Sequence, residues 1–418
     1  MSADPFKKLK VAEALKKLKV LAKDNFAGRS AHYDETASFP EKDFKELFKE
    51  GLLGAMVPEA YNGLGLGHHD GDIGSLWKMT KEIAKANMAL ARCWEGHANS
   101  MVLLNYIASS EQKKRWFKGV IEEGEIWSAW SGEPLAVAPH ENQKFGTRLS
   151  KVEGGYLLNG SKVFCSSAPG ADWAILLVNT AGEGGARHSG DASATVLMIA
   201  CKLADPTVSF DDSWWQPIGM KASVSYHVKF DNTFLPDENV IGNPGQYLSE
   251  DWQTRFTPHY AATFLGGAEA AFEHTLNYIK KQKKEQDPYI QHRIAKMSMN
   301  IDTANLWLQK VAGLWESAKD EEAKVAGNAA RYLIEQLATD TVNHAMHACG
   351  ARSMIRPSPL ERIYRDLSFY TRHDNDDQVL SMVGRAILGI DHDKSFFNPK
   401  EIKNTNVKIN GEEPQKTL

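Results

Sequence analysis

The chain has 418 residues with a formal net charge of −4, and 42% of its residues are hydrophobic and 24% charged. These are ordinary values for a globular protein, and the length predicts two or three domains. The sequence lacks the basic stripe that a nucleic-acid-binding surface needs, and it has no apolar run long enough to span a membrane. The four cysteines are far apart and form no CxxC pair. We therefore expect a cytoplasmic protein without a metal site.

Three zones follow one another along the chain. Residues 1–124 show helical spacing of apolar positions, interrupted by a Pro- and Gly-rich connection at residues 51–67. In residues 125–242 apolar and polar residues alternate with a period of two, as they do around Val228. The run at residues 174–178 is continuously apolar. This zone is predicted to be a β-sandwich or barrel of short strands, with the apolar run buried on both faces.

Helical spacing returns in residues 243–394, which are predicted to form a helical bundle, and residues 395–418 form a polar tail. One stripe recurs at helical spacing between residues 301 and 315, and a second between residues 379 and 390. The fold class is therefore α+β: an N-terminal helical domain, a middle β domain and a C-terminal bundle.

The connection before the last stripe contains the sequence His373-Asp374-Asn375. An imidazole and a carboxylate stand side by side there, near the start of a helix whose N–H groups favour negative charge. The segment can serve as a simple polar helix cap, or it can place two proton-transferring groups in front of a packed helix.

Six stretches together resemble the acyl-CoA dehydrogenase superfamily over nearly the whole chain. They are residues 51–67, SAWSGEP at 128–134, GGYLLNGSKVFCSSAPGAD at 154–172, residues 218–242, HACGARSMIRPSPLERIYRD at 347–366, and the His373-Asp374 turn. The resemblance implies that superfamily's three-domain fold and a bound flavin, FAD or FMN. It also implies a small-molecule substrate, possibly an acyl-CoA, and assembly as a homotetramer or homodimer.

On the dehydrogenase reading, the resemblance places Asp374 at the position of the family's catalytic base. Asp374 would remove a proton α to a thioester carbonyl while hydride passes from the β carbon to flavin N5. The family's usual glutamate is here shortened by one methylene. The retained Ser-Gly-Glu-Pro loop at residues 131–134 favours this reading slightly.

Other features resemble the reduced-flavin monooxygenase branch typified by dibenzothiophene monooxygenase. In that reading His97, Ser166 and His373 support a flavin C4a-hydroperoxide, and Asp374 orients His373. His97 can equally be a hydrogen-bonded core histidine, and Ser166 can satisfy a strand end. A non-catalytic flavoprotein scaffold is the third reading.

The resemblance also yields candidate ligand contacts. The cofactor-binding candidates are Trp130, Ser131, Phe164, Ser166, Gly350 and Arg352, and the substrate-binding candidates are Arg365 and Ser225. The family's Arg-x-x-Phe-Gly motif for the FAD pyrophosphate is missing from residues 278–297, which leaves FMN as an alternative to FAD. The redox partner would be an electron-transfer flavoprotein for a dehydrogenase and a flavin reductase for a monooxygenase.

Overall fold

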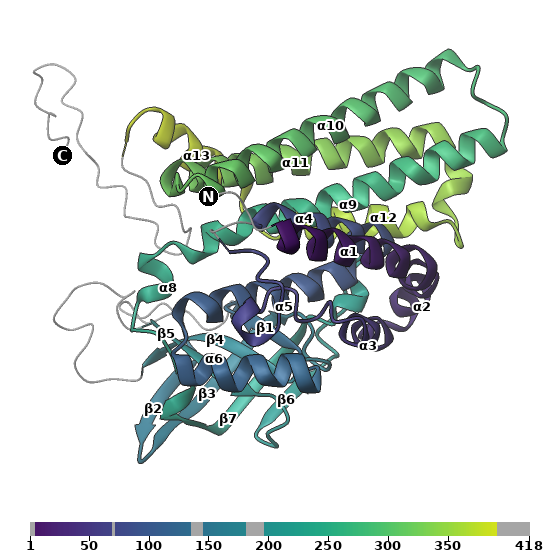
Figure 1. The fold of residues 1–418 in the computed structure, drawn as a ribbon. Helices are drawn as coiled ribbons and strands as arrows, with labels where there is room; N and C mark the ends of the chain where they lie inside the picture. The colour runs from purple at the N-terminus through teal and green to yellow at the C-terminus, as the bar shows by residue number, and fades with distance from the viewer. Residues whose placement is uncertain (1–4, 69–71, 135–144, 181–195, 391–418) are drawn as a thin grey trace, which may run out of the picture.

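The computed structural model describes residues 5–68, 72–134, 145–180 and 196–390. The polar tail expected at residues 395–418 lies outside this range. The described chain runs through helices, then strands, then helices again (Figure 1). Within these residues no helix has both the length and the apolar character needed to cross a lipid bilayer.

The first set of helices precedes the sheet in the chain. It comprises α1 (Pro5–Leu21), α2 (Ala27–Thr36), α3 (Glu41–Lys49), α4 (Ile73–Ala86), α5 (Met88–Ile107) and α6 (Ser110–Lys118). Within this set α5 packs against strand β1 (Trp127–Trp130). Side-chain N-caps begin three of these helices. The carboxylate of Asp72 accepts a hydrogen bond from the N–H of Ser75 at the start of α4. The Asn87 side chain accepts hydrogen bonds from the N–H groups of Ala89 and Leu90 at the start of α5, and Ser109 and Gln112 form a capping box at the start of α6.

The strands of the described residues form one mixed sheet. They are β1 (Trp127–Trp130), β2 (Arg148–Val152), β3 (Gly155–Cys165), β4 (Trp173–Thr180), β5 (Val196–Lys202), β6 (Val208–Asp211), β7 (Tyr226–Pro236) and β8 (Val240–Ile241). Their order is β6-β7-β3-β2-β4-β5-β8, and β1 pairs with β4 in parallel. As predicted, residues 174–178 are buried throughout in β4, and Val228 and Phe230 of β7 are buried while Lys229 between them is exposed.

The bundle is built from long helices that lie side by side (Figure 1). They are α9 (Trp252–Lys281), α10 (Pro288–Glu316) and α11 (Asp320–Cys349), followed by the shorter α12 (Pro359–Tyr370) and α13 (Asp376–Ile387), and the four-residue helix α8 (Gln246–Ser249) precedes them. The predicted stripe at residues 301–315 is buried along α10. The second stripe is buried at Val379 and Met382, whereas Ile387 is 79% exposed, because the end of α13 extends beyond its packing against α11.

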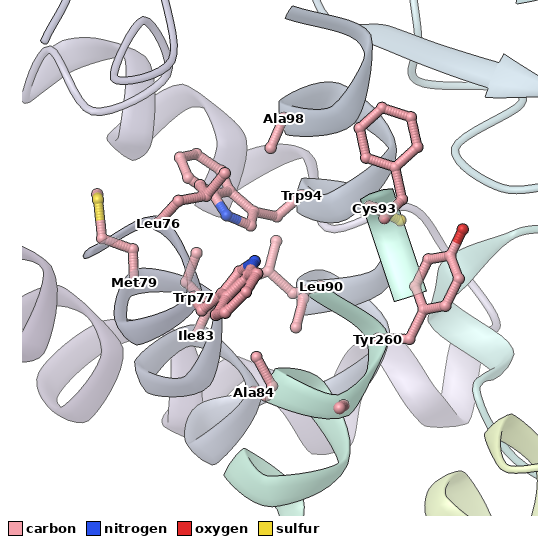
Figure 2. Packing of buried hydrophobic residues seen from close by; sticks show 14 of the residues in the cluster. Leu76, Trp77, Met79, Ile83, Ala84, Leu90, Cys93, Trp94, Ala98 and Tyr260 are labelled. Atoms are coloured by element: carbon pink, nitrogen blue, oxygen red, sulfur yellow. The ribbon is translucent and has the colours of Figure 1, made fainter. Parts of the chain in front are cut away.

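Helix α5 lies between the sheet and the bundle and contacts both β1 and α9 (Figure 1). Figure 2 shows Trp94 of α5 in a shared core with Trp77 of α4 and with Tyr260 of α9. The helices α4 and α9 approach so closely that a Cβ on Gly266 would lie 2.5 Å from the carbonyl oxygen of Lys81. On its other side α5 lies close to β1, since a Cβ on Gly96 would lie 3.1 Å from Oγ of Ser128.

Candidate active site

A cavity of about 400 Å³ lies where the ends of β1 and β3 face α5 and the connection between α12 and α13. It is lined by Arg92, Ala129, Trp130, Ser131, Gly132, Val163, Phe164, Ser166, Trp215, Met220, Ser223, Ser225, Gln253, Phe369, Tyr370, Arg372, His373 and Asp374. A smaller chamber of about 90 Å³ adjoins it and shares Arg92, Trp130 and His373. The cavity thus joins residues from all three parts of the chain.

The sheet side of the cavity is held by hydrogen bonds between the ends of β1 and β3. The indole N–H of Trp130 donates to the hydroxyl of Ser128 at 2.9 Å and to the carbonyl of Ser166 at 3.1 Å. The N–H of Val163 donates to the carbonyl of Gly132 at 3.0 Å. The Trp130 ring and the hydroxyl of Ser166 therefore have fixed positions on one wall.

Three serine hydroxyls form a buried chain along this wall. The Oγ atoms of Ser166 and Ser225 are 2.9 Å apart, and those of Ser225 and Ser223 are 2.8 Å apart. Three hydroxyl protons serve two hydrogen bonds, so one proton is left over. When Ser223 donates to Ser225 and Ser225 to Ser166, the hydroxyl of Ser166 is free to donate into the cavity.

Phe164 places an exposed aromatic ring at the same wall. Its backbone has φ of 54°, a left-handed conformation that is uncommon for a bulky residue and often found at functional sites. Its side chain is 55% exposed, and its ring meets the edge of Trp214 with centroids 4.8 Å apart. An aromatic ring presented in this way suits a flat aromatic ligand.

His373 and Asp374 form the opposite wall. The Nδ1 atom of His373 lies 3.1 Å from Oδ1 of Asp374, and the imidazole packs between the rings of Tyr260 and Tyr370 at centroid distances of 4.8 and 5.9 Å. The Nε atom of Arg331, which is fully buried, lies 3.5 Å from Oδ2 of Asp374. The imidazole is thereby fixed in position and orientation.

The charges around Asp374 decide its protonation. Burial raises the pKa of Asp374, but His373, Arg331 and Arg92 together outweigh burial, so its pKa is lowered overall. The carboxylate therefore stays ionised and is a poor acceptor for a proton from carbon. Its Oδ1 accepts the Nδ1–H of His373, which leaves Nε2 of the imidazole to exchange a proton in the cavity.

A buried polar cluster around Glu95 includes Tyr370, whose ring packs against His373. Glu95 on α5 accepts hydrogen bonds from the hydroxyls of Thr263 and Tyr370 and pairs with Arg92 at 3.3 Å. Both Glu95 and Tyr370 are buried. The sequence analysis missed Arg92 and Glu95. The available signal was a pair of opposite charges three residues apart in the mainly apolar α5 sequence MALARCWEGHANSMVLL.

Comparison with known proteins identifies the family of this chain. Residues 12–124 match the family described as "Acyl-CoA dehydrogenase, N-terminal domain", and residues 259–377 match "Acyl-CoA dehydrogenase, C-terminal domain". The chain belongs to the acyl-CoA dehydrogenase superfamily. This confirms the family and the fold class inferred from the sequence motifs.

Both branches weighed in the sequence analysis occur among its relatives. The chain is 25% identical to the mitochondrial isovaleryl-CoA dehydrogenase of Arabidopsis thaliana over 381 residues, which cover 88% of each protein. It is 24% identical to the dibenzothiophene monooxygenase of Mycolicibacterium goodii over 85% of this chain and 89% of that protein. The crystal structure of FMN-bound TdsC from Paenibacillus sp. A11-2 superposes with a TM-score of 0.81 at 21% identity, covering 92% of this chain and all of TdsC.

The superfamily's flavin, FAD or FMN, fits the residues of the cavity. Trp130 and Phe164 supply aromatic surface, and the hydroxyl of Ser166, 2.9 Å from that of Ser225, can supply a donor on the same wall. Of the residues proposed from sequence, Trp130, Ser131, Phe164, Ser166, Ser225, His373 and Asp374 all line this cavity. The structure thus brings together most of the proposed site.

His97 lies in the core beneath the site and does not line either chamber. Its Nε2–H donates to the carbonyl of Leu53 at 3.0 Å, and its Nδ1 accepts the N–H of Trp127 at 3.1 Å. Burial lowers the pKa of His97 to about 4. The neutral ring therefore joins the segment before α4 to β1, which is the core-histidine alternative of the sequence analysis.

Three other proposed residues also lie away from the cavity. Gly350 and Arg352 follow the end of α11 and are exposed. Arg365 forms an ion pair with Asp34 at 2.6 Å, which joins α12 to α2, and a second one with Glu361 of its own helix at 2.8 Å. In this arrangement its guanidinium serves an interhelical contact.

The Ser-Gly-Glu-Pro loop has a structural use in this chain. The carboxylate of Glu133 accepts the N–H of Thr147 at 3.0 Å and pairs with the fully buried ammonium of Lys162 at 2.7 Å. Burial lowers the pKa of Lys162 to about 8. Glu133 thus fixes the loop after β1 to β3 and does not reach the cavity, so its retention does not favour dehydrogenation.

A larger cavity of about 1320 Å³ opens on the far side of Trp215, between the helices α2 and α3 and the sheet. Trp215 lines both cavities, and its indole N–H is held by the carbonyl of Lys221 at 3.0 Å. The wall of this larger cavity includes Phe39, Phe44 and several carboxylates. His373 and Asp374 are not part of it. Its position suits an entrance to the site rather than the site itself.

Proposed function

We propose that this protein is a flavin-dependent monooxygenase that acts on a small organic substrate. The observation that carries the proposal is the pair of His373 and Asp374, whose carboxylate is kept ionised first by the charge and hydrogen bond of His373 and then by Arg331. Reduced flavin, when bound, would activate O2 so that one oxygen atom enters the substrate and the other leaves as water.

The residues of this chain have separate roles in that reaction. Trp130 and Phe164 hold the flat ring, and Ser166 donates a hydrogen bond toward it from the end of the serine chain. His373 gives or takes a proton through Nε2, and Asp374 orients it. Tyr260 and Tyr370 pack against the imidazole and hold its ring in place.

Dehydrogenation of an acyl thioester is the second candidate. The 25% identity to isovaleryl-CoA dehydrogenase favours it, and Asp374 lines the cavity as a base would. The lowered pKa of Asp374 and its contacts with His373 and Arg331 count against a role in carbon deprotonation.

An anaerobic titration separates the two candidates. The oxidised flavoprotein is mixed with isovaleryl-CoA, and the visible absorption of the flavin is recorded. A dehydrogenase transfers hydride to the flavin and bleaches this band. We expect the band to persist. Bleaching at a rate that depends on Asp374 would overturn the proposal.

The partners follow from the proposed reaction. A monooxygenase of this kind needs a separate flavin reductase to supply reduced flavin, whereas the dehydrogenase would pass electrons to an electron-transfer flavoprotein. We also infer a homotetramer or homodimer, because α10 and the end of α13 expose Tyr289, Leu306, Ile387 and Leu388. Light scattering that gives the mass of one chain would refute the inferred assembly. The four buried, unpaired cysteines suit the cytoplasmic location that we propose.

A further inference from the structure

Arg92 places a buried guanidinium at the boundary between the main cavity and the inner chamber. It lines both, and its side chain is 16% exposed. Within the described residues it makes one hydrogen bond, from Nη1 to Oε2 of Glu95 at 3.3 Å. The rings of Tyr260 and Tyr370 lie 5.6 and 5.8 Å from its Cζ atom and cover its faces. Most of its five N–H groups therefore have no protein acceptor and can be reached from the cavity.

The other contacts of this cluster keep Arg92 in place. Glu95 is fully buried and is held by the hydroxyls of Thr263 and Tyr370, so its carboxylate cannot turn to meet more of the guanidinium. A buried guanidinium with unmet donors is unfavourable unless an acceptor enters the site. Arginine matches the planar, paired oxygens of a carboxylate or sulfur oxyanion better than any other side chain.

We infer that Arg92 binds the oxyanion of a small organic acid, a carboxylate or a sulfur oxyanion, and so selects the substrate of this site. The inference rests on the proposed function, because it assumes that flavin and substrate share this cavity. The inner chamber beyond Arg92 is lined on one part by the apolar residues Leu103, Ile175, Leu177 and Phe256, and elsewhere by polar groups that include Asn99 and Gln253. The substrate therefore combines a compact apolar body with an oxyanion head, and an uncharged aliphatic chain would leave Arg92 without an acceptor.

Isothermal titration of the oxidised flavoprotein with benzoate and with benzamide tests this inference. The two probes have the same ring and differ in charge. We expect benzoate to bind the wild-type protein at least about tenfold more tightly than benzamide, since a hydrogen bond to a charged group has about that value. Equal affinity for the two probes would overturn the inference.

The informative variant is the double substitution Arg92→Met with Glu95→Gln. Replacing Arg92 alone would leave the Glu95 carboxylate buried without its cation, and the protein could unfold for that reason. The double variant removes both charges, keeps an amide oxygen to accept from one of the two hydroxyls of Thr263 and Tyr370, and offers an NH2 group to the oxygen of the other. We expect it to bind benzoate and benzamide equally. Retained preference for benzoate in a folded double variant would overturn the inference.

Two further variants check that the effect belongs to Arg92. Arg92→Lys keeps the charge but loses the paired donors, and we expect it to keep part of the preference for benzoate. Arg372 lines the same cavity but is exposed, so Arg372→Gln should keep the full preference. A preference lost in Arg372→Gln and kept in the double variant would assign anion binding to Arg372 and refute the inference.

Flavin affinity of the same variants completes the test. We expect the dissociation constant of FMN to be unchanged in the double variant, because Arg92 is assigned to the substrate. A large loss of flavin affinity without loss of benzoate preference would overturn the inference. None of these measurements requires turnover, so the proposed oxygen chemistry can fail while anion binding by Arg92 stands.

Discussion

The imidazole of His373 is fixed by its neighbour Asp374, with Nδ1 and Oδ1 3.1 Å apart, and Asp374 is itself fixed by the buried Arg331. Because Asp374 contacts Arg331 on one side and His373 on the other, its carboxylate can orient the imidazole of His373. In the proposed reaction, Nε2 of His373 is therefore the atom that would exchange a proton in the cavity.

We predict that His373 and Asp374 act as one unit in the reaction of the reduced protein with O2. His373→Gln and Asp374→Asn should each shorten the life of the first optical transient at least about tenfold, because each removes a positioned proton donor or its orienting partner. The double variant should be no worse than either single variant. Stopped-flow absorbance measures the lifetimes, and additive losses would show that the residues act separately.

Asp376 offers the matched control for Asp374. Its Oδ1 also contacts Arg331, at 2.5 Å, but no contact joins it to His373. Asp376→Asn should lower the melting temperature without changing the transient's lifetime. An equal loss of lifetime in this variant would mean that Arg331 and not the His373 pair is responsible.

The serine chain predicts a graded effect of removing each hydroxyl. Ser166→Ala removes the hydroxyl that donates into the cavity and should weaken flavin binding and shorten the transient most. Ser223→Ala removes the far end of the chain, 2.8 Å from Ser225, and should have a smaller effect. Flavin fluorescence titration and stopped-flow measurements on both variants check the order. A larger effect from Ser223→Ala would show that the hydrogen bonds of the chain run in the opposite direction, from Ser166 to Ser223.

His97 is predicted to stabilise the fold rather than to take part in the chemistry. His97→Ala should lower the free energy of unfolding by about 2–4 kcal/mol, because it opens a cavity and leaves two buried backbone groups unpaired. Denaturant titration measures this loss. In the folded fraction at low temperature the lifetime of the optical transient should be unchanged. A lost transient in a protein of unchanged stability would return His97 to the catalytic site.

Glu335 predicts a specific dependence of stability on pH. Burial raises the pKa of Glu335 from 4.5 to about 7, despite the opposing charge of Arg331. Below pH 4.5 the residue is protonated in both the folded and the unfolded state and has no effect. As pH rises from 4.5 to 7 the unfolded chain releases this proton while the folded chain retains it, so the folded state loses stability, and above pH 7 the loss is constant.

Glu335→Gln should therefore raise the free energy of unfolding at pH 8, relative to that at pH 4.5, by about 1–2 kcal/mol compared with the wild type. Urea titrations at the two pH values measure this difference. An unchanged pH dependence would show that Arg331 keeps Glu335 ionised in the folded state.

Much of the fold was predictable because its signals are local. The change of apolar spacing near residue 125 marks the change from helices to strands, and the stripe at residues 301–315 is the buried face of α10. The proximity of Ser166, Ser225 and His373 was inferred from the family resemblance, since these residues lie far apart in the sequence. The cavity depends on how α5 packs between β1 and α9, which no local pattern encodes.

Where the site in the structure differs from the site expected from the sequence, the difference arises from contacts between residues far apart in the sequence or from a partner on the same helix. The role of His97 depends on the carbonyl of Leu53 and the N–H of Trp127, and that of Arg365 depends on Asp34, more than 300 residues away. Arg92 was overlooked because its charge is balanced by Glu95 one turn along the same helix. Such partners become visible only when the tertiary packing is known.

The most direct test of the central claim is to reduce the flavoprotein without oxygen and mix it with O2 in a stopped-flow spectrometer. The account predicts a distinct transient absorbance that forms first and decays before the oxidised spectrum returns, with a lifetime that depends on His373 and Asp374. Reoxidation in one slow step without a transient, in a protein whose flavin is bleached by an acyl-CoA, would contradict the account and establish a dehydrogenase.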